Sequence, residues 1–150
     1  MIDHEAIRDL AWFRYTLRRF LRFSENAARK CGITPQQHQL MLGIAGFTGR
    51  GNATISELAE FLQERNNSAV GLVERAVQSG LVHRQNDKSD KRLVVVSLTP
   101  GGEDILSRLT MLHQEEVQRV QAGFLTNRKL QSRFLASAKR TDLKGKTTAR

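Results

Sequence analysis

The sequence has little of what covalent or metal cross-links require. Its single cysteine, Cys31, excludes an internal disulfide, and its 4 histidines show no spacing typical of a zinc site. We therefore expect no metal and no cofactor. Apolar runs extend over only a few residues, which excludes a transmembrane helix. The N-terminal segment carries acidic residues early and arginines throughout, unlike a secretory signal, so we expect a reduced, cytoplasmic protein.

The residue patterns of common enzymes are missing as well. There is no phosphate-binding glycine loop and no recognisable pairing of a nucleophile with a base, so we do not expect an enzyme. Positive charge is abundant: 24 lysines and arginines face 15 aspartates and glutamates, a net charge of +9. A balance this basic favours a polyanionic partner, either nucleic acid or an anionic membrane surface. With 150 residues, 39% of them hydrophobic, the chain is long enough for one globular domain with its own core.

Helical patterns occupy both ends of the chain. Residues 3–30 carry apolar side chains at three- and four-residue steps, which predicts an amphipathic helix. Asp3 is its expected N-cap and Gly32 its expected stop. The apolar stripe consists of Ile7, Leu10, Phe13, Leu17, Phe20 and Leu21.

The C-terminal third continues this helical pattern. Thr99 and Pro100 predict the start of a helix that ends at Gly123, and residues 125–139 predict a further helix. Residues 141–150 form a basic tail that we expect to be disordered. Apolar stripes at both chain ends are hard to bury within one small helical domain. We therefore expect them to pack against a second copy of the chain.

The middle of the chain begins with a capped helix. Thr34 followed by proline is typical of a helix start, and Gly46 is expected to end this helix. The side chains expected to be buried are Leu40, Met41, Ile44 and Ala45.

Two short helices follow a glycine-rich loop. Apolar residues between Ile55 and Leu62 predict the first, and a polar turn over residues 63–66 leads into the second, which ends at Gly80. The second helix is expected to bury Ala69, Leu72, Val73, Ala76 and Val77. Two short helices joined by a tight turn indicate a helix–turn–helix.

A β-hairpin is predicted directly after this pair of helices. Residues 81–85 favour a strand, NDKSDKR is a charged turn, and the β-branched run LVVVSLT favours a second strand. A helix–turn–helix followed by a hairpin with a charged tip is typical of a winged helix. The predicted fold class is therefore mainly α with a small β-hairpin wing.

Four stretches of the chain resemble the MarR family of winged helix–turn–helix transcription regulators. They are ITPQQHQLM, ISELAEFLQ, NNSAVGLVERAVQSGLVHR and NDKSDKRLVVVSLTPGG, in this order over residues 33–102. The last is the most specific, because it combines a D-x-x-D-x-R wing motif with LTPxG. The resemblance implies one domain over residues 1–140 that forms an intertwined homodimer. Its dimerisation helices would span about residues 3–30 and 100–140, and its winged helix about residues 34–99.

The helix that starts near Asn66 is the expected recognition helix. Asparagine can pair with adenine, serine with bases or phosphates, and valine can contact a thymine methyl group. The expected DNA contacts are Arg65, Asn66, Asn67, Ser68, Val70, Gly71 and Arg75. In the alternative, the two asparagines and the serine only cap the helix, and Val70 is partly buried. Arg75 holds either a phosphate or a carboxylate such as Glu74. Gly71 stands where family members often carry a basic residue.

The hairpin tip is the second expected DNA contact. The resemblance implies that Lys91 or Arg92 enters the minor groove, while Asp87 or Asp90 pairs with an arginine to shape the turn. A guanidinium suits the narrow, electronegative minor groove of A·T-rich DNA better than an ammonium does. A solvated hairpin tip is the alternative. Arg84 is expected to contact a phosphate or to pair with one of the aspartates.

The resemblance also implies a ligand pocket where the dimer helices meet the DNA-binding lobe. Its candidates are Trp12, Tyr15, His38 and Met41, and ordinary packing is the alternative for each. Some relatives sense peroxides through a cysteine, but Cys31 lies at the far end of its helix without a resolving cysteine. We therefore do not expect redox sensing.

These features together predict a sequence-specific, ligand-responsive transcriptional repressor that binds a pseudo-palindromic operator as a homodimer. The expected partners are double-stranded DNA, a second copy of the chain and a small-molecule effector, but not a membrane. Two alternatives remain: an architectural protein that binds DNA by charge alone, and a protein-interaction module that no longer binds DNA.

Overall fold

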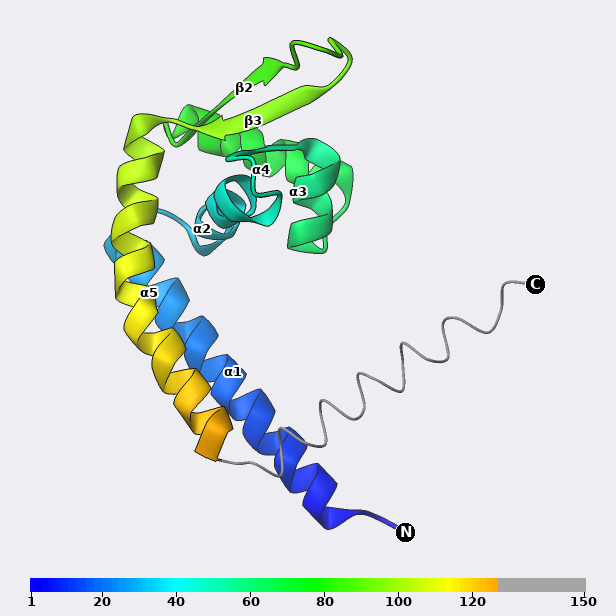
Figure 1. Ribbon diagram of the computed structural model, residues 1–150, viewed down its shortest axis with the longest axis vertical. Helices are drawn as coiled ribbons and strands as arrows, with labels where there is room; N and C mark the ends of the chain where they lie inside the picture. The colour runs from blue at the N-terminus through cyan, green and yellow to red at the C-terminus, as the bar shows by residue number, and fades with distance from the viewer. Residues whose placement is uncertain (127–150) are drawn as a thin grey trace, which may run out of the picture. The chain divides into compact units, whose positions relative to one another are not determined.

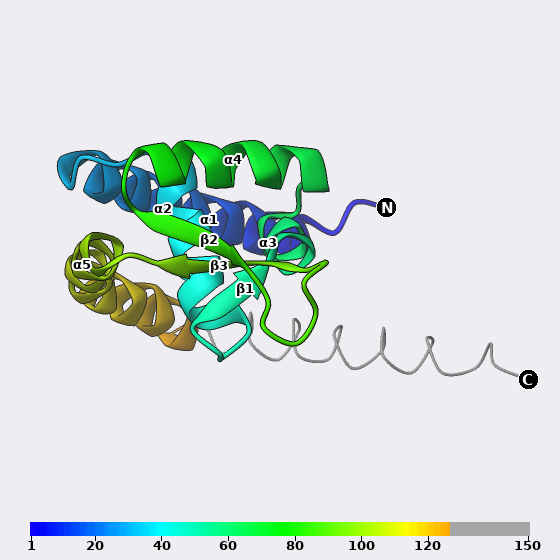
Figure 2. The same cartoon turned by 90° about the horizontal axis from the view of Figure 1, so that it is seen from above.

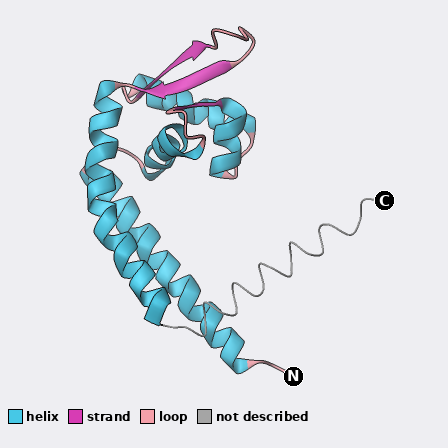
Figure 3. Cartoon of the chain, viewed as in Figure 1, coloured by secondary structure: helices cyan, strands magenta, loops and turns pink. Residues whose placement is uncertain are grey.

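A computed structural model describes residues 1–126 of the chain (Figure 1). Its elements are mostly helices, with one small sheet (Figure 3). In chain order they are α1 (His4–Lys30), α2 (Pro35–Leu42), the π-helical turn η1 (Gly43–Phe47), β1 (Asn52–Thr54), α3 (Ile55–Leu62), α4 (Asn66–Gln78), β2 (Val82–Asn86), β3 (Val94–Leu98) and α5 (Pro100–Thr126). None of these helices combines the length and the apolar character needed to cross a membrane.

The C-terminal helix departs from its predicted end. Helix α5 continues through Gly123 to Thr126, so the expected stop at that glycine is wrong. A single glycine costs a helix only about 1 kcal/mol and does not by itself end it. The separate helix predicted over residues 125–139 lies outside the described residues except for its start, and so does the tail over residues 141–150.

The chain divides into two compact units. Within the described residues, one consists of Met1–Arg22 together with residues 114–126, and the other consists of Phe23–His113. The second unit contains the helix–turn–helix and the sheet, with the last turns of α1 and the first half of α5.

The sheet of the Phe23–His113 unit has three antiparallel strands in the order β1-β3-β2. Strands β2 and β3 form the predicted hairpin, from Val82 opposite Leu98 to Asn86 opposite Val94. Strand β1 adds Ala53 opposite Val96 on the other edge of β3. Strand β1 was not predicted, because three residues between a glycine-rich loop and a helix cap are too short to show an alternating pattern.

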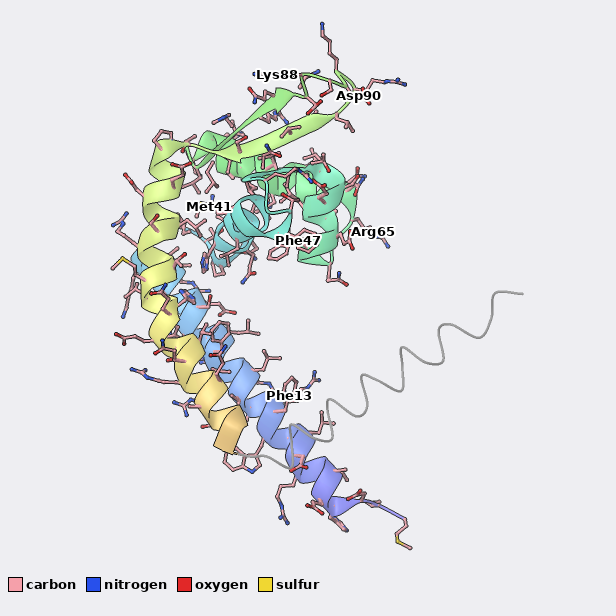
Figure 4. The ribbon with its side chains drawn as sticks, viewed as in Figure 1. Phe13, Met41, Phe47, Arg65, Lys88 and Asp90 are labelled. Carbon is pink, nitrogen blue, oxygen red and sulfur yellow. The ribbon has the colours of Figure 1, made fainter. Side chains whose placement is uncertain are left out.

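The core of this unit lies between the helices and the sheet. Its fully buried side chains include Leu40, Met41, Ile44, Leu58, Val73, Val96 and Leu109, and Figure 4 shows Met41 among the helices. Two expected core residues are wrong. Ala45 is exposed, because α2 passes into a wider π-helical turn rather than ending at Gly46. Val77 is 37% exposed, because each four-residue step rotates about 40° further round the helix.

The helix ends follow the predicted caps. Asp3 accepts a hydrogen bond from the backbone N–H of Ala6 (3.0 Å), and Thr34 forms a capping box with Gln37. Gly32 (φ 81°) and Gly80 (φ 70°) adopt the left-handed conformation that ends α1 and α4.

The loop between β3 and α5 is fastened to the end of α4. The Thr99 hydroxyl donates to the carbonyl groups of Gly80 (2.6 Å) and Leu81 (3.1 Å), and the Gly102 N–H donates to the Thr99 hydroxyl (3.0 Å). A Cβ atom on Gly102 would collide with the carbonyl group of Leu81. The glycine of the LTPxG motif is therefore required by close backbone packing.

Candidate nucleic-acid interface

Helix α4 is positioned by a tight turn after α3. Gln63 ends α3 in the left-handed conformation (φ 54°), and the backbone N–H of Glu64 returns to the Ala59 carbonyl (2.9 Å). Ala69, Leu72, Val73 and Ala76 hold α4 on the core, each at most 8% exposed. Helix α4 also packs against β2, and Figure 2 shows it at one edge of the unit. The predicted helix–turn–helix is confirmed.

The opposite face of α4 carries the predicted DNA contacts. Arg65, Asn66, Asn67, Ser68 and Arg75 are exposed, whereas Val70 and Gly71 are half-buried. Residue 65 is the N-cap, and its side chain makes no capping hydrogen bond. The alternative that Asn66, Asn67 and Ser68 only cap the helix is therefore wrong. The Asn66 amide instead donates to the Ser56 hydroxyl (3.4 Å).

An ion pair joins α4 to the first wing strand. Nη1 of Arg84 lies 3.7 Å from a carboxylate oxygen of Glu74, and both side chains are about half exposed. One alternative had predicted that Arg84 pairs with a wing aspartate. It is wrong, because Arg84 pairs with Glu74 on α4. The same contact places the Glu74 carboxylate against Arg84 rather than Arg75. Because the pair is exposed, we expect it to contribute at most about 1 kcal/mol.

Two aspartates shape the wing turn by different means. The Asp87 carboxylate accepts hydrogen bonds from the backbone N–H groups of Ser89 (2.8 Å) and Asp90 (2.9 Å), which lower the pKa of Asp87. Asp90 accepts from the backbone N–H of Arg92 (3.0 Å) and also lies 3.5 Å from Nε of that guanidinium. The predicted pairing of an aspartate with an arginine thus occurs at Asp90 but not at Asp87.

The tip of the wing presents cations to solvent. The Arg92 side chain is 94% exposed, and Lys88 and Lys91 are exposed beside it. Figure 4 shows Lys88 and Asp90 at this tip and Arg65 at the start of α4. The Asn86 amide donates to the Lys91 carbonyl (2.7 Å) and closes the turn. The sequence analysis did not single out Lys88 or Asn86.

A further cation lies where α3 begins. Nη2 of Arg50 lies 2.7 Å from both carboxylate oxygens of Glu57, and Glu57 forms a capping box with Thr54. The hydrogen bond from Arg50, and then those from Thr54, lower the pKa of Glu57. This group was not predicted, although T-x-x-E before an apolar run is a recognised signal for a capping box.

The four candidate pocket residues belong to different units. His38 (2% exposed) and Met41 (0% exposed) lie in the core of the Phe23–His113 unit. The His38 ring lies 3.5 Å from the Ser24 hydroxyl, and its centroid is 5.0 Å from that of His113. Burial, and then the neighbouring His113, lower the pKa of His38 to about 4.

Trp12 and Tyr15 lie on α1 in the other unit, where both are exposed. Their rings meet edge to face at 5.5 Å, and the Arg19 guanidinium lies 5.8 Å from the Tyr15 ring. Together with Arg8 and Ala11 they line a hollow of about 290 Å³.

A helix–turn–helix with an exposed second helix, followed by a hairpin wing, defines the winged helix class of proteins. Comparison with known proteins gives the family. The model of the MarR family matches residues 32–93. The chain is 32% identical over 118 residues to the uncharacterized HTH-type transcriptional regulator YfiV of Bacillus subtilis, covering 71% of this chain and 69% of YfiV. The chain therefore belongs to the MarR family of winged helix–turn–helix transcriptional regulators.

Two further comparisons agree with this assignment. The HTH-type transcriptional repressor MdtR of Bacillus subtilis is 28% identical over 127 residues, which cover 77% of this chain and 75% of MdtR. The crystal structure of a MarR mutant from E. coli in complex with operator DNA has the same fold. It matches with a TM-score of 0.67 at 22% identity, over 93% of this chain and 99% of that one.

Proposed function

We propose that the protein represses transcription by binding a specific operator as a homodimer, and that a small-molecule effector releases it. The proposal rests chiefly on the outward face of α4. That face presents exposed amides, a hydroxyl and an arginine, in the same unit as a basic wing whose turn is held by two aspartates. These are the side chains that read base edges and bind phosphates.

Helix α4 would enter the major groove with its N-terminal turns. Asn67 and Ser68 would contact base edges or phosphates there, and Val70 could reach a thymine methyl group. Because the side chain of the N-cap residue, Arg65, makes no capping hydrogen bond, the first backbone N–H groups of α4 are open to a phosphate at the positive end of the helix dipole. Arg65 at this end adds a cation.

The wing would lie along the minor groove. Arg92 is the better candidate for insertion, because its side chain is almost fully exposed and its backbone is fixed by Asp90. Lys91 and Lys88 would then neutralise phosphates on either side. The ion pair with Glu74 holds Arg84 close to α4. From there Arg84 would contact the DNA phosphates between the two grooves.

Dimerisation is supported by the apolar side chains that α1 leaves exposed. Ile7 and Leu10 are each 54% exposed, Leu17 is 40% and Leu21 is 42%. They recur at three- and four-residue steps and so form one stripe, which a second copy would cover. A two-fold dimer presents two α4 helices about one turn of DNA apart, ~34 Å, which matches a pseudo-palindromic operator. In this proposal both compact units act as one functional domain.

An effector would act by favouring a dimer arrangement that does not fit the operator. A difference of about 5.5 kcal/mol in its binding to the two arrangements would switch the population almost completely. Trp12 and Tyr15 are our candidates for the effector site, because they are exposed and line a hollow. His38 and Met41 are weaker candidates, because both are buried in a packed core.

The test starts with selection of binding sites from random duplexes. The winning duplex and a scrambled duplex are then compared by fluorescence anisotropy at about 50 and 200 mM salt. We expect a pseudo-palindromic winner that binds ~10³-fold or more tightly than the scrambled duplex. The variant Arg92→Ala should weaken binding, whereas Arg29→Ala on α1, where Arg29 pairs with Glu25, serves as the matched control.

The other outcomes favour the alternatives. Steep salt dependence on both duplexes without an enriched site would indicate an architectural DNA-binding protein. A dimer by analytical ultracentrifugation that binds neither duplex would indicate an interaction module.

A further inference from the structure

The outward face of α4 lacks a side chain at Gly71. Asn67, Gly71 and Arg75 follow one another at four-residue spacing and therefore lie along one ridge of the helix. The outer two are exposed, whereas Gly71 is half-buried although it belongs to the outward face.

Arg75 is the group that covers Gly71. A Cβ atom on residue 71 would lie 3.5 Å from Nη1 of Arg75. Apart from its two chain neighbours, no other side chain of the described residues comes within 4 Å of that point. This direction is the ordinary one, because helical side chains lean towards the N-terminus of their helix. Four residues correspond to about 6 Å along the helix axis, so the guanidinium is carried about one turn towards the N-terminal end.

The charge of Arg75 is not neutralised by a carboxylate in the described part of the chain. Its neighbour Glu74 lies against Arg84, at 3.7 Å. Within residues 1–126, Arg75 takes part in no ion pair or hydrogen bond of its side chain. Its five N–H donors are therefore available to a ligand on the outward face.

We propose that Arg75, lying over Gly71, sets base specificity by reading a guanine at one position of each half-site. The inference rests on the proposed function and adds a residue-level assignment to it. Recognition helices present mainly their N-terminal residues to base edges. Because Gly71 has no side chain, the Arg75 guanidinium can extend from the third turn of α4 towards these N-terminal residues. Two parallel N–H donors match O6 and N7 of guanine, a fit that lysine does not provide.

If Arg75 reads a guanine from above Gly71, its contact with the base should depend on the size of the side chain at residue 71. A Cβ alone meets the guanidinium at an ordinary contact distance, whereas a longer side chain would occupy the space and displace it. Gly71→Leu should therefore reproduce the loss seen in Arg75→Ala, and Gly71→Ala should lose less. Leucine is a better helix former than glycine, so this variant does not weaken α4 itself.

The experiment measures binding of the full-length chain to its selected operator and to operators with each base pair replaced in turn. Wild type should prefer G·C at one symmetry-related pair of positions by about 10- to 100-fold. Arg75→Ala and Arg75→Lys should remove that preference and leave the other positions unchanged. Binding to random duplexes should stay within about 2-fold of wild type, because phosphate contacts persist. Arg29→Ala is the control on the surface of α1.

The outcomes separate the two proposals. If the wild-type chain enriches no operator, the proposed function fails and this inference falls with it. If an operator is found but Arg75→Ala weakens all sequences equally and reduces the salt slope by about 1, Arg75 holds a phosphate and only this inference is overturned. A double variant Gly71→Leu/Arg75→Ala that loses no more specificity than either single variant supports the coupling. Additive losses overturn it.

Discussion

The buried imidazole of His38 makes a sharp prediction about acid stability. Its pKa is lowered from 6.5 to about 4 by burial and by His113. Between these values the unfolded chain binds a proton that the folded chain does not, so the free energy of unfolding must fall as the pH drops from about 6.5 towards 4. Below the folded pKa the contribution levels off.

The size of the effect follows from the shift. One pKa unit corresponds to 1.36 kcal/mol, so a shift of this size is worth about 3 kcal/mol, of which about 2 kcal/mol is lost by pH 5. Because His38 is 2% exposed, solvent screening takes little from this figure. A loss of this size is a large fraction of the stability of a typical domain.

The assay is urea unfolding at pH 7.5 and pH 5, at one fixed protein concentration because dimerisation would add to the stability. His38→Gln keeps a polar side chain of similar size but does not titrate. We expect it to lose about 2 kcal/mol less than wild type between the two pH values. His4→Gln, at an exposed position, should behave like wild type. Equal losses for wild type and His38→Gln would refute the reasoning, whatever the absolute stability of the variant.

Three further predictions concern the backbone, the wing and the apolar stripe. Gly102→Ala should destabilise the protein by about 1–3 kcal/mol in thermal unfolding, because its Cβ collides with the Leu81 carbonyl; an unchanged melting temperature would contradict this packing. Asp87→Ala should leave two backbone N–H groups of the wing without their acceptor and weaken operator binding. The melting temperature should change little, because the wing tip is exposed. Fluorescence anisotropy and calorimetry on the same samples separate the two effects. Leu10→Glu combined with Leu17→Glu should give a monomer by analytical ultracentrifugation with far weaker operator binding, and a dimer in this variant would show that the exposed stripe is not the interface.

The sequence was most informative where structure is set by neighbours in the chain. Thr34 and Gln37 form their capping box from side chains three residues apart, and Gly80 ends α4 through its own backbone conformation. The wing turn is equally local, because the carboxylates of Asp87 and Asp90 bind N–H groups within three residues. Such features can be predicted from spacing alone.

The failures occurred where the outcome depends on a distant partner. Glu74 and Arg84 are ten positions apart and pair only because α4 packs against β2. Arg50 meets Glu57 across the three-residue strand β1, whose pairing with β3 no local pattern reveals. Ala45 faces solvent because a π-helical turn interrupts the ordinary helical periodicity. The two ion pairs follow from packing in three dimensions, whereas the exposure of Ala45 follows from a change in helical period that the spacing of apolar residues does not show.

The hydrogen bonds of Thr99 connect the end of α4 to two other segments. The Thr99 hydroxyl donates to the carbonyl groups of Gly80, which ends α4, and of Leu81, which immediately precedes β2, and it accepts from the Gly102 N–H in the first turn of α5. Gly102 brings that turn directly onto the Leu81 backbone. One threonine hydroxyl thus links the end of α4, the residue before β2 and the start of α5. Because one hydroxyl links these segments, we expect a tilt of the first turn of α5 to be transmitted to Leu81, just before the wing, and to Gly80, at the end of α4.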